Sequence, residues 1–531
     1  MKILLVGVEV GRWHSPRGGR GVTLRAAVVG PGGRFRRTGA QLSASVRAGR
    51  RARNLRWVGP MPLAVPTDLV REIVARQLPI LEDHLEEVGR SLLGWQRTAL
   101  NRLSHCCEPQ EGFALLRCAD CDQSRVVPFT CAVRGVCGTC GGRTMSSRAA
   151  AWVDSLFPKE VSVRQWVLTV PWPRRFLLAR HPGLTREVLS TALEVIFGWY
   201  SARCEAQTGR PGETGSVTVI QRFSSSLALN VHFHILAVDA ACVEQEDGTV
   251  LWHSVGPLTT EDVESLVTEV AARVEAMLAR RGYPADEPTT EEELDDTTPL
   301  LDAAAAGRAA LGVRAGRRTR RNKPLPSRPW SPSERCAEAS GYNLHAGVVV
   351  RERDALERLC RYVNRPIFSK ERLTLRDDGI VQLTLRRPWA DGTTSFLFSE
   401  LELVERMVAL LAPPHVNQVL YHGVLGARSR LRSRVVPTPT EPSASRGALR
   451  THGPPRKSDR WTRWADLLFR VFGVEGFACG CGGTLVLHAV VLPPATLDVL
   501  DSLKRSARAP PGGTVVLPPP AHLPPPPTPR S

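Results

Sequence analysis

The ten residues from Asn230 to Asp239, NVHFHILAVD, constrain the fold of this 531-residue chain more than any other stretch. Their apolar and β-prone side chains predict a buried strand. Side chains alternate between the two faces of a strand, so His232 and His234 should leave one face together while Phe233 packs on the other. The preceding run, Gly215–Phe223, also reads as a strand, and a short serine-rich turn joins the two. We therefore expect an antiparallel hairpin.

Two neutral imidazoles on one face suit a divalent cation that takes further ligands from elsewhere in the chain. Gln221 and His345 are both candidates for a third ligand. A histidine pair also occurs without metal, with one ring packed in the core and the other bonded to a backbone carbonyl. The pair therefore indicates a metal site only together with other segments that carry chemistry.

The charge of the chain favours a polyanionic partner. Lysine and arginine number 70 against 52 acidic residues, a formal net charge of +18. Such an excess is typical of nucleic-acid binding, although a GC-rich coding bias toward arginine, alanine, glycine and proline would also raise it. The chain has no apolar run of about 18 residues, so no membrane span is expected. Its N-terminus lacks the pattern of a secretory signal.

The cysteines predict structural zinc in a reducing compartment. Two CxxC pairs, Cys118/Cys121 and Cys137/Cys140, can each present two thiolates to one tetrahedral Zn²⁺. We expect these four to form one closed site, with a redox pair as the alternative. Cys106 and Cys131 are available as additional zinc ligands or as part of a different set. Much later in the chain, Cys479-Gly-Cys481 looks like a partial zinc knuckle.

A tyrosine in a basic frame is the candidate nucleophile. Tyr362 lies near the end of an expected helix, Arg351–Val363, with Arg358, Arg361 and Arg365 around it. Guanidinium groups placed in this way would neutralise a phosphodiester that the tyrosine attacks. A tyrosine at a helix end more commonly serves only in packing. None of the other tyrosines of the chain, however, is surrounded by arginines in this way. Tyr421 is the alternative nucleophile.

Helical periodicity and shifts in composition predict an α+β fold. Pro79 is expected to interrupt the first helix. We expect residues 1–60 to be a disordered basic arm, or an upstream artefact with Met61 as the start, and residues 61–150 to be a helical, cysteine-rich zinc- and DNA-binding module. Residues 151–426 should form the main domain, with a mobile insert at about 284–340. A linker (427–460), a small C-terminal module with a helix at Trp461–Phe472 (461–500) and a proline-rich disordered tail (501–531) should follow.

Taken together, these segments resemble the rolling-circle transposases of the IS91/ISCR type, which are HUH endonucleases. The resemblance runs from about Cys106 to Leu487 and rests on CAVRGVCGTCGGRTM, VRQWVLTVP, TVIQRFSSSLALNVHFHILAVD, GYNLHAGVVV, RLCRYVNRP, PWADGTTSF, VLYHGVL and WADLLFRVFGV. It implies a zinc-binding N-terminal module followed by an HUH-type antiparallel sheet with flanking helices.

The resemblance also implies roles for the candidate residues. His232 and His234 would hold a catalytic Mg²⁺ or Mn²⁺, and Tyr362 would cut one DNA strand through a 5′-phosphotyrosine. Structural Zn²⁺ would be bound by Cys118, Cys121, Cys137 and Cys140, and DNA phosphates by Arg358, Arg361 and Arg365. The implied partners are single-stranded DNA and the hairpin ends of the element, in the cytoplasm of a bacterium and associated with its nucleoid.

Two departures from the family pattern matter. Two-tyrosine relatives carry a second tyrosine four residues before the first, and here that position is Arg358, so we expect a single-tyrosine member. The partial knuckle Cys479-Gly-Cys481 lacks one residue of the CxxC in relatives, which leaves metal binding there in doubt. A plasmid replication initiator or relaxase of the same chemistry, and a non-catalytic zinc-dependent DNA-binding protein, are the alternatives.

Overall fold

The computed structural model describes residues 6–14, 20–28, 68–121, 123–133, 135–284, 296–329, 334–368, 370–437 and 476–506. The chain divides into two units, residues 1–56 and 57–531. In the first unit, β1 (Val6–His14) pairs antiparallel with β2 (Arg20–Val28). The expectation of a disordered arm is therefore wrong for these two segments. Val6, Val8 and Val10 alternate with glycine and glutamate, a strand pattern within glycine-rich sequence.

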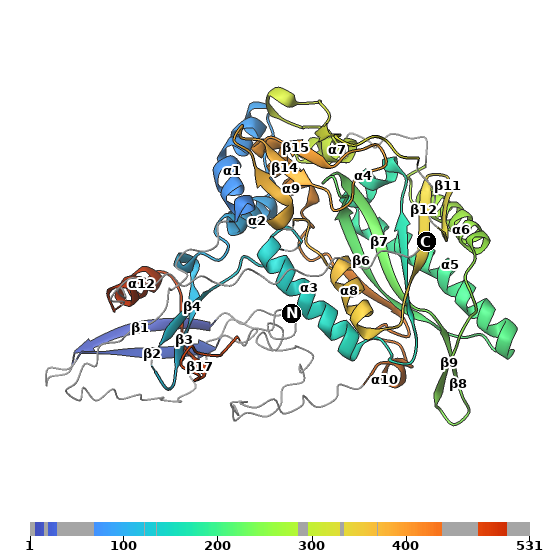
Figure 1. The fold of residues 1–531 in the computed structure, drawn as a ribbon, viewed down its shortest axis with the longest axis horizontal. Helices are drawn as coiled ribbons and strands as arrows, with labels where there is room; N and C mark the ends of the chain where they lie inside the picture. Colours follow the sequence, from blue (N-terminus) through green and yellow to red (C-terminus); the bar gives the residue numbers. More distant parts are fainter. Residues whose placement is uncertain are drawn as a thin grey trace. The chain divides into compact units, whose positions relative to one another are not determined.

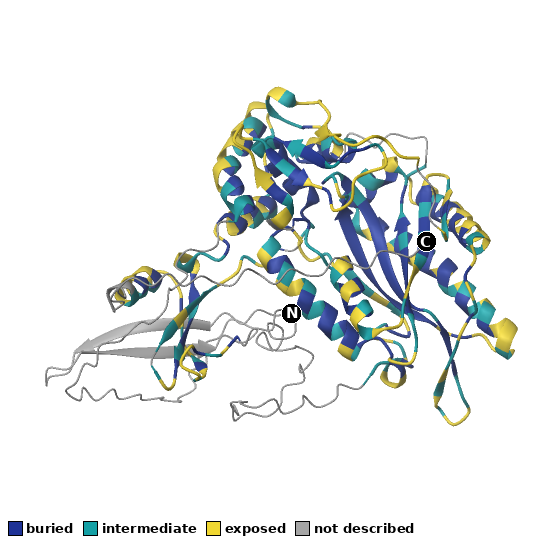
Figure 2. Cartoon of the chain, in the orientation of Figure 1, coloured by how far each residue is buried: buried dark blue, intermediate teal, exposed yellow. Residues whose placement is uncertain are grey.

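The second unit is built on a six-stranded sheet in which every neighbouring pair is antiparallel (Figure 1). The strand order is β11 (Cys336–Ala339), β12 (Tyr342–Val350), β5 (Val163–Thr169), β7 (Leu229–Val238), β6 (Gly215–Phe223) and β16 (Val419–Gly423). Strands β6 and β7 form the expected hairpin. Both are buried over almost their whole length, as expected for strands covered on two faces (Figure 2).

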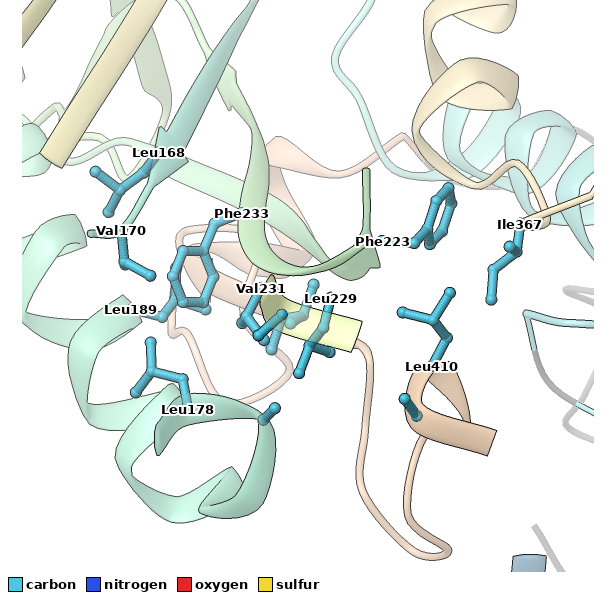
Figure 3. Packing of buried hydrophobic residues seen from close by; sticks show 14 of the residues in the cluster. Leu168, Val170, Leu178, Leu189, Phe223, Leu229, Val231, Phe233, Ile367 and Leu410 are labelled. Atoms are coloured by element: carbon cyan, nitrogen blue, oxygen red, sulfur yellow. The ribbon is translucent and has the colours of Figure 1, made fainter. Parts of the chain in front are cut away.

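Helices cover both faces of this sheet. One face presents Leu168 and Phe233 to a core that includes Leu189 (Figure 3). The helices that contribute to this core include α4 (Trp172–Arg180), α5 (Pro182–Thr208), α6 (Thr260–Arg280), α7 (Thr298–Ala306) and α9 (Glu400–Leu410). The other face presents Val219 and Leu236 to α3 (Gly138–Ser155) and α8 (Arg353–Val363), which pack against each other (Figure 1). The α+β class is confirmed.

The first helix runs through the proline that we expected to break it. Pro79 lies inside α1 (Leu69–Glu87), which is followed by α2 (Gly94–Ser104). Buried Ile73 and Leu81 lie on either side of the proline and pack in the same core. Pro79 itself is exposed, so water can bond the carbonyl that loses its helical partner. The packing of these apolar side chains in the core outweighs the loss of one helical hydrogen bond at Pro79.

Three smaller sheets complete the second unit. Their bounds are β10 (Arg320–Asn322), β15 (Ser395–Phe398), β14 (Val381–Thr384) and β13 (Leu373–Leu375) in the first; β17 (Leu485–Val491), β3 (Phe113–Cys118) and β4 (Ser124–Pro128) in the second; and β8 (Ala241–Glu244) with β9 (Val250–His253) in the third. The remaining elements among the described residues are η1 (Pro109–Glu111), η3 (Gly312–Arg314), η4 (Lys370–Arg372), α10 (Arg432–Val435) and α12 (Ala495–Ser506). None of the described helices is both long and apolar enough to cross a membrane.

Several expected boundaries are wrong. Helix α3 continues through the boundary proposed at 150. Within the supposed insert, α7 buries Leu300 and Leu301 in the main core and β10 pairs with β15, so this part is integral to the fold. The buried apolar residues of α7 recur at the three- to four-residue spacing of a helix, which places them on one face toward the core. The start of the supposed linker is also packed, because α10 buries Val435. The tail expected to be disordered from 501 instead begins within α12 (Ala495–Ser506), because Leu500 packs in a small core with Phe113. The rest of this tail and the expected helix at Trp461–Phe472 lie outside the described residues.

Candidate functional site

Strand β7 places the two histidines together on the sheet face that α3 and α8 cover. Leu236, two residues further on, packs in the core of that face. Gln221 of β6 and Thr169 of β5 lie directly opposite His232. His232 and His234 are 7% and 3% exposed. The two-residue period of the strand therefore brings both rings to one buried position, as the alternation predicted.

The two rings point their outer nitrogens at each other. Nε2 of His232 and Nε2 of His234 are 3.2 Å apart. Nδ1–H of His232 donates to the carbonyl of Asn230 at 2.8 Å, so Nε2 of this ring is the unprotonated nitrogen and acts as an acceptor. Nδ1 of His234 lies 2.8 Å from the side-chain amide of Gln165 on β5. Such bonds to the inner nitrogen orient metal-ligating histidines and set their tautomer.

Burial keeps both rings neutral. It lowers the pKa of His232 to about 4, although the carbonyl of Asn230 opposes the shift. Burial also lowers the pKa of His234 well below its usual value, and the neighbouring His232 adds to the effect. Neutral imidazole is the form that binds a cation. The pair is thus ready to act as metal ligands near neutral pH.

Helix α8 brings Tyr362 to this pair. Leu356, Cys360 and Val363 of the helix are buried, and Tyr362 lies on the more open side with 43% exposure. The ring centroids of Tyr362 and His234 are 5.8 Å apart in an edge-to-face arrangement. The helix contributes an accessible phenol beside two buried imidazoles. Sequence reasoning selected all three residues, and the structure brings them together.

The three flanking arginines differ in their surroundings. The guanidinium of Arg365 lies over the Tyr362 ring, with Cζ 4.2 Å from its centroid. Arg358 precedes Tyr362 by one helical turn and is exposed. Arg361 forms an ion pair with Glu357, so part of its charge is already balanced. Arg358 and Arg365 are therefore the members of the set that are best placed to meet an added phosphate.

Gln221 has an unused oxygen at the site. Its amide nitrogen donates to the carbonyl of Val363 at 2.7 Å, which ties β6 to the end of α8 next to Tyr362. Its Oε1 is buried and has no hydrogen-bond partner in the described part of the chain. A buried acceptor without a donor is unfavourable unless a ligand satisfies it. This oxygen fits a cation held by the two histidines.

The other residues considered for the site lie further away or are engaged. His345 of β12 is opposite Val167, which is itself opposite His234, so two strand spacings, roughly 10 Å, separate the histidines. Tyr421 of β16 accepts a hydrogen bond from the indole of Trp152 at 3.0 Å. Gln221 is thus the better candidate for a third ligand, and Tyr362 for the nucleophile.

Sequence reasoning missed two residues at the site. Gln165 is hydrogen-bonded to His234, and Arg175 of α4 is close enough for its charge to lower the pKa of His232. Arg175 is half-buried and donates to the carbonyl of Val170. Gln165 carries a signal in the sequence, because a polar residue within the strand run VRQWVLT is unusual. Arg175 carries none, since its approach depends on how α4 packs.

Among the described residues, eight cysteines form two groups of four, neither of them the expected one. The first, here called the local cluster, consists of Cys106, Cys131, Cys137 and Cys140. The second, here called the split cluster, consists of Cys118, Cys121, Cys479 and Cys481. The expectation that the two CxxC pairs share one metal is wrong, because β3 and α3 carry them into different places. The doubtful partial knuckle completes the second group.

The local cluster has the geometry of a zinc site. The sulfur of Cys106 is 3.6 Å from that of Cys137 and 3.8 Å from that of Cys140, and Cys131 lies 3.5 Å from Cys140. Four ligands at 2.3 Å in a tetrahedron place their sulfurs about 3.8 Å apart. Cys106, Cys137 and Cys140 are buried, and Cys131 is half-buried. Four sulfurs leave no open position, which fits a structural ion.

The local cluster lies against the chain that follows Tyr362. The amide of Ile367 donates to the carbonyl of Gly135 at 2.8 Å. A Cβ added at Gly141 would lie 2.5 Å from Cβ of Pro366, so the knuckle and this segment are in close contact. Arg148 of α3 also donates to the side chain of Asn364 at 3.1 Å. Helix α3, which begins at the local cluster, therefore holds the end of α8.

Two family models match the chain. The model described as "Putative transposase" matches residues 215–432, a range that contains β6, β7 and α8. The model described as "Transposase zinc-binding domain", of the IS91 type, matches residues 80–170, which contain the local cluster and α3. Neither the curated proteins nor the solved structures include a match to the chain.

Proposed function

Because the chain belongs to the IS91 family of transposases, we propose that it nicks and rejoins single-stranded DNA through a covalent bond to Tyr362. The observation that carries this proposal is the 5.8 Å separation between the rings of Tyr362 and His234, which come from different elements. A phenol beside two metal-ready imidazoles under arginine side chains suits attack on a phosphodiester.

The residues at the site fit a divalent cation. His232 and His234 would hold it through Nε2, with Oε1 of Gln221 as a third ligand. Mg²⁺ or Mn²⁺ bound there would polarise the scissile phosphate and stabilise charge in the transition state. The amide nitrogen of Gln165 lies against Nδ1 of His234 and donates to it. With this amide turned so that its oxygen accepts Nδ1–H instead, Nε2 of His234 would be free to bind the cation.

The covalent step is carried by this chain's own residues. The phenol oxygen of Tyr362 bonds to phosphorus and gives up its proton, and the bond to the 3′ oxygen breaks. That oxygen takes up a proton and leaves as a 3′-OH, while the 5′ end stays attached to the tyrosine. Arg365 and Arg358 would offset the phosphate charge. The reverse reaction with another 3′-OH rejoins strands without an external energy source.

The proposed mechanism uses a single tyrosine, because Arg358 stands one helical turn before Tyr362, at the position where two-tyrosine relatives carry their other tyrosine. The proposed substrate is single-stranded DNA, with the hairpin ends of the element as the recognised sites, as the resemblance to IS91-type transposases implies. The proposed location is the bacterial cytoplasm, close to the nucleoid, where such DNA occurs.

The test is trapping of a protein–DNA adduct. The purified chain and Mn²⁺ are incubated with a labelled oligonucleotide that carries the ends of the encoding element, and adducts are separated under denaturing conditions. We expect an adduct with wild type and with Tyr421→Phe, and none with Tyr362→Phe. An adduct that survives Tyr362→Phe and disappears with Tyr421→Phe would contradict the assignment of the nucleophile. Unchanged DNA binding without any adduct in wild type would favour a non-catalytic DNA-binding protein.

A further inference from the structure

We propose that the split cluster binds a second Zn²⁺, which fastens residues 476–506 to the N-terminal zinc-binding module. The family match to the zinc-binding domain ends at residue 170 and leaves Cys479 and Cys481 without a role. The proposal is independent of the chemistry at Tyr362, because it concerns a different part of the fold. It assigns a metal site to four thiols that the chain supplies from two distant segments.

The sulfur positions of the split cluster match one tetrahedral ion. Sγ of Cys118 lies 3.6 Å from Sγ of Cys481, and Sγ of Cys121 lies 3.5 Å from Sγ of Cys479. All four sulfurs lie within 4.8 Å of one another. Tetrahedral Zn–S bonds of 2.3 Å require separations of about 3.8 Å, and thiolates are the ligands that select zinc. These separations are similar to those between the sulfurs of the local cluster.

Two glycines allow a knuckle that is one residue short. Gly482 has φ +88°, a conformation that other residues rarely adopt. A Cβ at Gly483 would lie 2.1 Å from a carboxylate oxygen of Asp120 and 2.9 Å from Sγ of Cys118. The backbone N–H of Gly483 donates to Sγ of Cys481 at 3.4 Å. The tight turn after Cys481 thus lets both sulfurs of the CxC reach the CxxC knuckle.

The surrounding structure holds the two segments in register. Strand β17 pairs with β3, with Leu485 opposite Cys118 and Val491 opposite Phe113. Leu116, Cys118, Cys479 and Leu485 form a small buried cluster beside the sulfurs. At the other end of the strand, the hydroxyl of Thr496 donates to the carbonyl of Gln110 at 2.9 Å. The ligands are therefore presented by a folded frame.

A disulfide is the competing use of these thiols. An S–S bond needs about 2.05 Å, well below the separations within the cluster. The pairs Cys118/Cys481 and Cys121/Cys479 are nevertheless close enough to oxidise. The experiment must therefore distinguish a metal site from two crosslinks.

The test combines metal content with thiol protection in the full-length chain. Zinc is counted by mass spectrometry in protein purified under reducing conditions. Cysteines are then alkylated in the folded state and mapped by peptide. We expect two zinc ions per chain and protection of both clusters in wild type. The matched control is Cys336→Ser, which changes a thiol outside both clusters and should leave two ions.

The decisive variant is Cys481→Ser. We expect one zinc ion to remain, with Cys118 and Cys121 becoming reactive together with Cys479. The local cluster should stay protected, which shows that the chain is still folded. Cys137→Ser should give the reverse pattern.

Three results would overturn the proposal. One zinc ion in wild type, unchanged by Cys481→Ser, would mean that the split cluster holds none. Loss of both ions in Cys481→Ser would mean that the clusters are not separate sites. Peptides linked by disulfides between Cys118 or Cys121 and the C-terminal pair would assign these thiols to crosslinks.

Discussion

Replacing Gly141 by alanine should disturb the site through the contact between the local cluster and the segment after Tyr362. The added Cβ would lie 2.5 Å from Cβ of Pro366. Ordinary carbon–carbon contact begins near 3.5 Å, so the two groups must separate by about 1 Å. Pro366 follows Tyr362 by four residues, and the displacement would therefore reach the end of α8.

The structure supplies a matched control. Gly142 is the next residue of the same helix, and a Cβ there meets nothing within 4 Å. Alanine in place of a helical glycine stabilises by about 1 kcal/mol in either position. Overpacking costs about 1–3 kcal/mol and applies to Gly141 alone. We expect Gly142→Ala to be more stable than wild type, and more stable than Gly141→Ala by about 1–3 kcal/mol.

The assays are chemical denaturation, zinc content and the rate of adduct formation in a single turnover. A reacting group displaced by about 1 Å can lose roughly 100-fold in rate. We therefore expect adduct formation to slow by about 10- to 100-fold in Gly141→Ala and to be unchanged in Gly142→Ala, with wild-type zinc in both. Equal rates and equal stabilities in the two variants would refute the idea that the local cluster positions Tyr362.

Three further predictions follow from the buried polar groups. Burial raises the pKa of Glu405 to about 7 even though its carboxylate accepts the amides of Ala310 and Leu311. Between these two pKa values the folded protein keeps a proton on Glu405 that the unfolded chain, with a pKa near 4.5, releases. The free energy of unfolding should therefore fall by up to about 3 kcal/mol as pH rises from 4.5 to 7. Chemical denaturation across this pH range should show this decrease, and Glu405→Gln should remove it. His232→Ala should abolish Mn²⁺-dependent cleavage while DNA binding in a mobility-shift assay is largely kept, and a parallel loss of both would mean that the histidine holds the fold. Gln165→Leu removes the group bonded to Nδ1 of His234 and should weaken Mn²⁺ binding about 10- to 100-fold by titration; unchanged affinity would show that the amide does not orient the ring.

Local patterns determined the parts of this protein that depend on neighbours in sequence. The period of two in β7 was sufficient to place His232 and His234 on one face, since side-chain direction in a strand is a local property. The amphipathic spacing of α8 likewise predicted that Tyr362 lies on a helix beside buried Leu359 and Val363. The family resemblance then indicated which chemistry such residues perform.

Tertiary structure decided which local units meet. Nothing local distinguishes a CxxC that pairs with the next one from a CxxC that pairs with cysteines more than 350 residues away, because the choice depends on β17 joining β3. Tertiary structure also decided the outcome at Pro79. The proline stays within α1 because the residues before and after it bury apolar side chains on the same face of the helix.

The approach of Tyr362 to His234 also required the fold. It depends on α8 packing beside α3, on Gln221 reaching the carbonyl of Val363, and on the contact between Gly141 and Pro366. Each of these contacts joins segments that are far apart in the chain. Their energies arise from packing and buried hydrogen bonds, which periodicity and spacing do not encode.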